Sequence, residues 1–493
     1  MDRVQFIDTT LRDGQQSMWA SGMRTAMMLP ALPDIDRAGF EAIEFFVPSI
    51  QLKKLSREFR DNPWHWVKLG AKSVQDPSRL RLHSGYTSYI QEIPKCIGKL
   101  MLKIVADYGI TEVRESNYWN DFKDNNLIEE IEEFHKLGMS VIINLAYSVS
   151  PRHTDEYFIS RAKDAVALKP YRICLKDVGG IMTPERVREL VPKIQSAIGD
   201  IPLEFHAHCS NGLAPFNVLE AVQSGIRHVH TAIPPLANGS SQPSIFNAVR
   251  NVRALGYETD VDLTALKAVE EHFTNIANRE NLPIGVPLEY DQTQYHHQVP
   301  GGMISNLRFQ LEKVGMGNGL EQALEEAVRV RADFGYPIMI TPLSQYVGTQ
   351  AAINVMVGER YKEVSDDVIR LALGQRGEEA TRVMDPDVRA KILNRPRAEE
   401  LSRLSAFDDM SIEEARRKYG KNLTDEELIL EASAGEGAVD IARQAPFPQS
   451  YPYPYSLQHP LVRLTQKLIQ ITNKSYISVQ KGDFSLEVKK VQQ

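Results

Sequence analysis

The stretch PLEFHAHC (202–209) predicts a short buried strand that ends in two histidines. It is one of eight strand-like runs, and each is followed by a longer stretch with helical periodicity, which is typical of a parallel sheet built from βα units. Eight such units match the size of a TIM barrel, in which chemistry takes place at the carboxyl ends of the strands. A doubly wound sheet is the structural alternative, but it would need Gly-rich crossover turns that we do not find in the sequence. The runs are VQFIDTT (4–10), FEAIEFF (40–46), RLRLH (79–83), TEVRES (111–116), SVIINLAYS (140–148), RICLKD (172–177), PLEFHAHC (202–209) and HVHTAI (228–233).

The pattern changes after the barrel, which we assign to residues 1–298. Long amphipathic segments such as GLEQALEEAVRVRADFG (319–335) predict a mostly helical second domain over residues 299–440. Residues 441–460 are rich in Pro and Tyr and are expected to form an extended linker, because proline interrupts helices. The tail, residues 461–493, is predicted to contain a helix and then a β-hairpin around Lys481-Gly482-Asp483.

The composition excludes several classes of protein. The 493 residues include 57 Lys+Arg and 64 Asp+Glu, and a net charge of −7 provides no basic surface for nucleic acid or an anionic membrane. The three cysteines form no CxxC pair, which fits a reducing cytoplasm. We find no signal peptide and no apolar run long enough to span a membrane. We therefore expect a cytoplasmic protein without a nucleic-acid partner.

The strongest chemical signal is the pair His206 and His208, because residues two apart on a strand project to the same face. Asp13 follows the first predicted strand and Lys176 lies at the end of the sixth, so both are expected at the same mouth of the barrel. A lysine beside a metal site is unexpected, since its ammonium repels a cation. It is either a base or nucleophile with a lowered pKa, or an amine that CO2 has converted into an anionic ligand, or simply the partner of Asp177.

Several segments resemble a known enzyme family. DTTLRDGQQS (8–17), CLKDVGG (174–180), HAHCSNGLA (206–214) and NGSSQPS (238–244) resemble the superfamily of metal-dependent lyase and carboxyltransferase barrels. HQVPGGMISNLRFQL (297–311) and GYPIMITPLSQYVGTQAAINVMVGERY (335–361) narrow the resemblance to the biotin-dependent carboxyltransferases, which include pyruvate carboxylase, transcarboxylase and the oxaloacetate decarboxylase α subunit. The resemblance implies an enzyme that transfers CO2 from carboxybiotin to the enolate of a carbonyl acceptor.

The resemblance also assigns the metal ligands. Asp13, His206 and His208 would bind a divalent metal, and a carboxylated Lys176 would be the fourth ligand. Zinc, manganese and cobalt all suit such a set.

Three further residues receive roles from the same resemblance. Arg12 would stabilise the enolate oxygen, and Gln16 would hydrogen-bond the acceptor. Ser240 occupies the position of the family's threonine, which moves a proton between the acceptor carbon and biotin. Serine retains the hydroxyl that this role requires.

The acceptor side departs from the pyruvate-specific members of the family. His83 stands where they have an arginine that binds the pyruvate carboxylate, and Val-Pro-Ser at 47–49 replaces their Gly-Gly-Ala. Residues 114–119 replace a run that contains Phe-Asp. Arg81 and Arg114 are candidates for a replacement clamp, although Arg81 is equally compatible with an outward strand position. We therefore expect an acceptor other than pyruvate.

The sequence contains no Ala-Met-Lys-Met biotinylation segment, so we expect biotin on a separate carrier protein, together with a separate biotin carboxylase subunit. The tail after residue 461 either docks such a partner or packs on its own chain, and a homo-oligomer is expected. Three other functions stay open. The enzyme could run the reaction backwards as a β-keto acid decarboxylase, it could be a biotin-independent aldol or Claisen lyase, or the chain could be an inactive scaffold.

Overall fold

The computed structural model describes most of the chain. The described residues are 2–83, 93–299, 304, 307, 311, 319–404, 410–448, 451, 453, 476–481 and 484–489.

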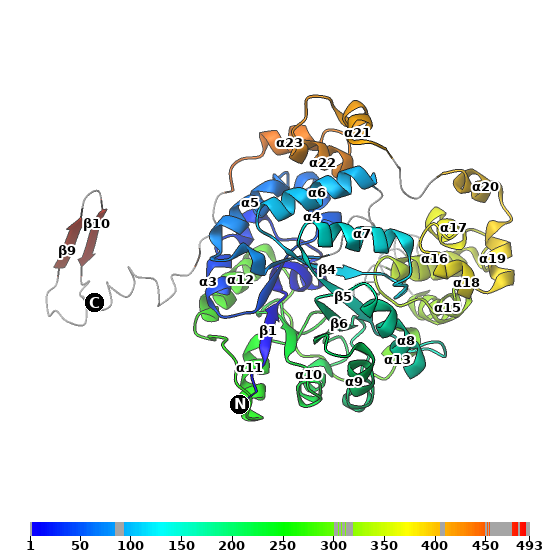
Figure 1. Cartoon of the computed structure of the whole chain (residues 1–493), viewed down its shortest axis with the longest axis horizontal. Coiled ribbons are helices and arrows are strands. Elements are labelled where there is room, and N and C mark those ends of the chain that lie inside the picture. Colours follow the sequence, from blue (N-terminus) through cyan, green and yellow to red (C-terminus); the bar gives the residue numbers. More distant parts are fainter. Residues whose placement is uncertain are drawn as a thin grey trace.

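A closed barrel of eight parallel strands forms the centre of the molecule, with neighbours in the order β1 to β8 (Figure 1). Each predicted strand is present, and the doubly wound alternative is wrong because β1 also pairs with β8 and so closes the sheet. The strands are buried along nearly their whole length, as expected when helices cover a parallel sheet. Their bounds are β1 (Gln5–Asp8), β2 (Ala42–Phe46), β3 (Leu80–His83), β4 (Glu112–Ser116), β5 (Ser140–Ala146), β6 (Arg172–Asp177), β7 (Leu203–Ala207) and β8 (His228–Thr231).

Helices surround the barrel, and several begin at side-chain caps. Asp124, Thr154 and Thr183 each accept hydrogen bonds from backbone N–H groups in the first turn of the helix that follows. The elements are η1 (Thr10–Gly14), α1 (Gln15–Trp19), α2 (Thr25–Met28), α3 (Leu32–Arg37), α4 (Pro48–Lys53), η2 (Lys54–Glu58), α5 (Pro63–Ser73), η3 (Pro77–Arg79), α6 (Lys95–Asp107), α7 (Asn125–Lys136), α8 (Asp155–Val166), α9 (Pro184–Ile198), α10 (Ala214–Gln223), α11 (Ile245–Ala254), α12 (Leu266–Glu280) and α13 (Gln294–His297).

A helical domain lies beside the barrel, at the right of Figure 1, and has its own hydrophobic core. Phe334, Val347 and Leu371 are fully buried in that core. The helical segment predicted over 319–335 is present as α15. The helices are α15 (Leu320–Asp333), α16 (Leu343–Val357), α17 (Asp366–Ala372), α18 (Glu379–Val383), α19 (Pro386–Leu393) and α20 (Pro396–Ser402).

Three later helices return to the barrel and lie over α5 and α6, at the top of Figure 1. Leu428 and Ile429 are completely buried in the hydrophobic core of the barrel, and the Trp64 indole donates to the Glu426 carbonyl at 2.9 Å. The structure thus groups these helices with the barrel core, although the sequence division places most of them in the helical domain. They are α21 (Ile412–Tyr419), α22 (Asp425–Ala434) and α23 (Ala438–Gln444).

The segment after α23 follows the barrel surface. The Tyr453 hydroxyl donates to Asp34 at 2.5 Å, and the Tyr451 hydroxyl donates to Glu280 at 2.9 Å. The predicted hairpin is present as β9 (Tyr476–Lys481) and β10 (Phe484–Lys489), which pair antiparallel. The helix predicted over 461–471 lies outside the described residues.

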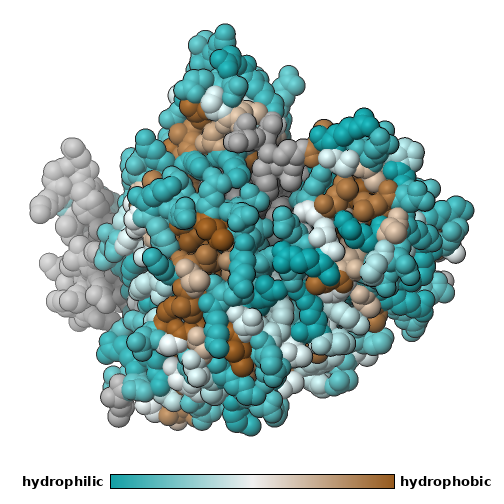
Figure 2. Space-filling view, turned by 45° about the vertical axis from the view of Figure 1, so that its right-hand side comes forward, coloured by the Kyte–Doolittle hydropathy of each residue, from teal (hydrophilic) through white to brown (hydrophobic). Residues whose placement is uncertain are grey.

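The surface shown in Figure 2 is mostly hydrophilic, and its hydrophobic residues form separate clusters rather than one continuous face. Among the described residues, no helix combines the length and the apolar character that crossing a membrane requires.

Candidate active site

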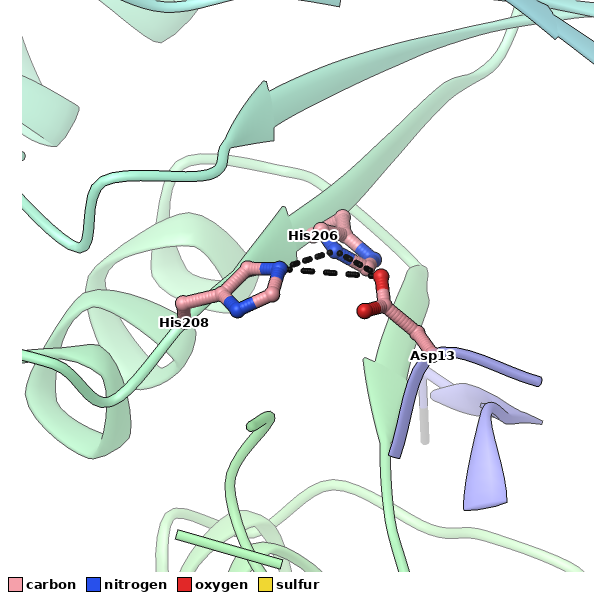
Figure 3. Close-up of side chains that lie close together, drawn as sticks. All are labelled: Asp13, His206 and His208. Carbon is pink, nitrogen blue, oxygen red and sulfur yellow. Dashed lines mark hydrogen bonds and ion pairs between the residues drawn. The ribbon is translucent and has the colours of Figure 1, made fainter. Parts of the chain in front are cut away.

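Three potential metal ligands meet at the carboxyl end of the strands. His206 is on β7, His208 follows directly, and Asp13 lies in η1, a π-helical turn after β1 (Figure 3). Asp13 Oδ2 is 3.1 Å from His206 Nε2 and 3.6 Å from His208 Nε2, and the two Nε2 atoms are 3.2 Å apart. All three residues are buried. The predicted ligands Asp13, His206 and His208 therefore do converge on one point.

The donor chemistry of this cluster suits a divalent cation. His208 Nδ1 donates to the Ser240 carbonyl oxygen at 2.7 Å, which leaves a lone pair on Nε2. Burial opposes ionisation of Asp13, but the Arg12 guanidinium beside it holds the pKa of its carboxyl well below the usual value. Lone pairs and a carboxylate that face one another repel unless a cation lies between them. Ligands bound at about 2.1 Å in tetrahedral geometry are about 3.4 Å apart, which is close to the observed spacing.

Lys176 lies next to this cluster, since it pairs with His206 in the register of β6 and β7. The side chain is buried, and burial, together with the charges of Arg114 and Arg12, lowers the pKa of its amine to about 7. The adjacent Asp177 carboxylate instead accepts from the backbone N–H groups of Ile181 and Met182, at 3.0 and 2.8 Å. With a pKa of about 7, a substantial fraction of the amine is neutral near pH 7, which both of the predicted chemical roles of Lys176 require.

Glu44 on β2 holds the two arginines of the site. It accepts from Arg12 Nε at 2.8 Å through one oxygen, and its other oxygen is 2.5 Å from an Arg114 nitrogen. Arg12 also lies 3.0 Å from Asp13, which places its guanidinium at the edge of the metal cluster. Arg114 is completely buried and lies 3.4 Å from His206 Nδ1. Sequence reasoning did not find Glu44, because a single acid within an apolar strand carries no distinguishing spacing.

The predicted acceptor residues lie at the same mouth. His83 ends β3, and burial with the charges of Arg12, Arg114 and Lys176 keeps the pKa of its imidazole well below the usual value, so the ring is neutral. His83 Nδ1 and Gln16 Oε1 are buried and have no hydrogen-bond partner among the described residues. Two polar atoms are thus available for a bound molecule.

Ser240 and Gln242 approach the metal cluster from the loop after β8. The Ser240 hydroxyl donates to the Ser17 carbonyl at 2.8 Å, while the Gln242 amide nitrogen lies 3.1 Å from His208 Nε2. The loop therefore places both an amide donor and a hydroxyl beside the histidines. Gln242 was not predicted, although it lies within the quoted segment 238–244.

Arg81 is not available at the mouth. It is completely buried and makes two hydrogen bonds, of 2.9 and 3.0 Å, to the Glu204 carboxylate near the other end of the barrel. Arg172 also contacts Glu204 at 3.2 Å, and Glu112 contacts Arg81 at 2.5 Å. The suggestion that Arg81 clamps the acceptor is therefore wrong, because Glu204 already occupies its guanidinium, and the side chain points inward rather than outward.

Comparison with known proteins is consistent with this arrangement. Residues 115–272 match the HMGL-like family model, and residues 295–452 match the conserved carboxylase domain. A subunit of the pyruvate carboxylase of Methanocaldococcus jannaschii is 33% identical over 397 residues, which cover 79% of this chain and 68% of that protein. The chain belongs to the family of biotin-dependent carboxyltransferases. The predicted family and fold are thereby confirmed.

One further relative and one solved structure are also similar to this chain. The 2-oxoglutarate carboxylase large subunit of Hydrogenobacter thermophilus is 29% identical over 441 residues, which cover 87% of this chain and 67% of that protein. The carboxyl transferase domain of Rhizobium etli pyruvate carboxylase, solved with pyruvate and biocytin, superposes with a TM-score of 0.78 at 20% identity. That match covers 90% of this chain and 77% of the solved chain, and it extends the likeness in fold beyond the barrel.

Proposed function

We propose that this carboxyltransferase moves CO2 from carboxybiotin, attached to another polypeptide, to the enolate of a carbonyl acceptor other than pyruvate. The observation that carries the proposal is the buried convergence of Asp13, His206 and His208 beside Lys176, whose amine has its pKa lowered to about 7. A divalent metal held by these four residues, with Lys176 carboxylated, would polarise the acceptor carbonyl and so favour its enolate.

Arg12 would stabilise the negative charge that develops on the acceptor oxygen. Its Nε and one terminal nitrogen are held by Glu44, and the same terminal nitrogen lies 3.0 Å from Asp13. A fixed guanidinium in a buried site needs no reorganisation when charge develops, which is the basis of electrostatic catalysis. Gln16 lies in α1, directly after the π-helical turn that holds Asp13, and its side-chain amide N–H would donate to the carboxylate or carbonyl of the acceptor.

The Ser240 hydroxyl would move the proton between the acceptor carbon and the biotin ring. Its backbone is fixed by the hydrogen bond from His208, so the hydroxyl stays close to the metal cluster. The hydroxyl would exchange its present hydrogen bond to the Ser17 carbonyl for one to the bound substrates. A positioned proton carrier of this kind contributes a factor of about 10²–10⁴ in rate.

The environment of His83 argues for an acceptor other than pyruvate. A neutral imidazole cannot form the two-pronged ion pair that arginine makes with a small carboxylate. Arg114 does not supply that ion pair either, because it is buried against Glu44. The acceptor would therefore be bound through its carbonyl, through neutral hydrogen bonds and through groups that pyruvate lacks.

Carboxylation assays with a biotin carboxylase, a biotinylated carrier, ATP and labelled bicarbonate test the proposal. The candidate acceptors are pyruvate, 2-oxoglutarate, the substrate named for one relative, and acyl-CoA thioesters. We expect label in a stable acid with at least one acceptor, and a kcat/KM at least tenfold above that for pyruvate. Pyruvate as the preferred acceptor would refute the acceptor proposal. Label transfer that does not depend on the carrier would refute the carboxybiotin step.

A further inference from the structure

A column of buried hydrogen-bonding groups runs from the interior of the barrel to the metal cluster. Glu204 Oε2 is 2.9 Å from His230 Nε2, and His230 Nδ1 is 2.9 Å from His206 Nδ1. All three side chains are completely buried. Of these three residues, only His206 is a proposed metal ligand, and Glu204 and His230 have no role in the proposed mechanism.

Glu204, at the end of the column away from the metal cluster, acts only as a hydrogen-bond acceptor. Arg81 binds both oxygens of Glu204, at 2.9 and 3.0 Å, and Arg172 approaches one of them at 3.2 Å. Two guanidiniums, which are always charged, keep this carboxylate ionised even though it is buried. An ionised carboxylate only accepts hydrogen bonds, so His230 must carry its proton on Nε2.

The position of the proton on His230 in turn fixes the position of the proton on His206. With its proton on Nε2, a neutral His230 presents a lone pair at Nδ1, and the nearest group able to donate to it is His206 Nδ1–H, at 2.9 Å. An Arg114 nitrogen also approaches His206 Nδ1, but at 3.4 Å, which is longer than an N–H hydrogen bond. His206 then has its lone pair on Nε2, the atom that lies 3.1 Å from Asp13. The Gln242 amide nitrogen, 3.3 Å from His206 Nε2, fits a lone pair at the same place.

We propose that Glu204 and His230 are positioning residues that hold His206 in the tautomer that binds the metal. The inference deepens the proposed function, because it rests on a metal bound by Asp13, His206 and His208. Groups of this kind behind a histidine ligand typically change metal affinity by a factor of about 10–100.

The same residues do not suit a second metal site. Cys174, Glu204 and His230 do lie within ligand distance of one another. However, an Arg114 nitrogen is 3.7 Å from Cys174 Sγ, and two guanidiniums contact Glu204. A cation placed there would face three positive charges, and both nitrogens of His230 already have partners.

Cobalt binding by the full chain tests the proposal. Co²⁺ affinity is measured by competition with a chromophoric chelator, and the visible absorption of the bound Co²⁺ reports its ligand geometry. Glu204→Gln allows the amide to donate to His230 and so removes the constraint on the tautomer. We expect a loss of affinity of about 10–100-fold and an altered Co²⁺ spectrum. Glu112→Gln is the matched control, because Glu112 contacts the same Arg81 but not His230, and we expect its affinity to stay within threefold.

A second variant keeps the test decisive if Glu204→Gln fails to fold. His230→Phe retains a ring of similar size and the ion pairs of Glu204 with Arg81 and Arg172, and it removes both the acceptor for His206 Nδ1 and the Nε2–H that donates to Glu204. We expect the same loss of affinity. If the folded variants bind Co²⁺ within threefold of the unmodified chain with an unchanged spectrum, the positioning role is overturned while the metal site stands. If the unmodified chain binds no Co²⁺, both the proposed metal site and the positioning role are refuted.

Discussion

Lys176→Met is expected to stabilise the metal-free protein while abolishing its function. In the folded chain, burial and the charges of Arg114 and Arg12 lower the pKa of Lys176 to about 7, from 10.5 in an exposed lysine. The folded state therefore binds this proton more weakly than the unfolded state does. The lysine costs stability in full below about pH 7, and that cost disappears as the pH rises through 10.5.

The size of the effect follows from the two pKa values. At about 1.4 kcal/mol per unit, the cost of Lys176 is about 4 kcal/mol at pH 7, about 3 kcal/mol at pH 8 and about 1 kcal/mol at pH 10. Methionine has a similar length and no charge, so the variant should avoid this cost at every pH.

The assay is urea unfolding of metal-free protein in CO2-free buffer, because carboxylation would consume the neutral amine. At pH 7 we expect the Lys176→Met chain to unfold at a higher urea concentration than the unmodified chain. This difference between the two urea midpoints should shrink toward pH 10. Lys163→Met on the exposed face of α8 is the control and should show no such gap. Equal midpoints at pH 7, or a gap that does not depend on pH, would show that the Lys176 environment is not as described.

Three other outcomes are expected. His208→Ala should lower metal content at least tenfold by elemental analysis, since one of the four proposed protein ligands is lost, and normal metal content would contradict the assignment. Ser240→Ala should slow carboxyl transfer by about 10²–10⁴-fold whereas Ser240→Thr should stay within tenfold, and equal rates would exclude the proton-carrier role. Leu428→Ala should destabilise the chain by about 2–5 kcal/mol in thermal unfolding without changing metal affinity, because a completely buried side chain between α22 and the barrel is lost.

The barrel was predictable because its strands share a simple pattern. Runs such as RICLKD (172–177) combine an apolar body with polar residues at the carboxyl end, and the structure places them as β6 and its equivalents. The return of α22 to the barrel was not predictable. Its buried Leu428 has the same local pattern as a residue of the helical domain, and only the folded chain shows that α22 contacts Trp64 through the Glu426 carbonyl and that Leu428 belongs to the barrel core.

The site was predictable where spacing carried information. His206 and His208 alternate on one strand, so their convergence follows from strand geometry. The pairing of Arg81 with Glu204 inside the barrel was not predicted, because alternating charges along a strand are more typical of a solvent-exposed face. They can face inward only because each is neutralised by a residue more than a hundred positions away, at 2.9 Å.

The charged interior of the barrel also limits how this protein can change over evolution. Arg81, Arg172 and Glu204 form a buried ion-pair cluster, in which Glu112 and Glu41 also pair with the arginines. The loss of one of the three therefore leaves an uncompensated buried charge, which costs about 3–5 kcal/mol. Substitution of one member is therefore tolerated only when another changes with it. In an alignment of close relatives, these three positions should vary together or not at all, whereas the exposed ion pairs on the outer helices should drift independently.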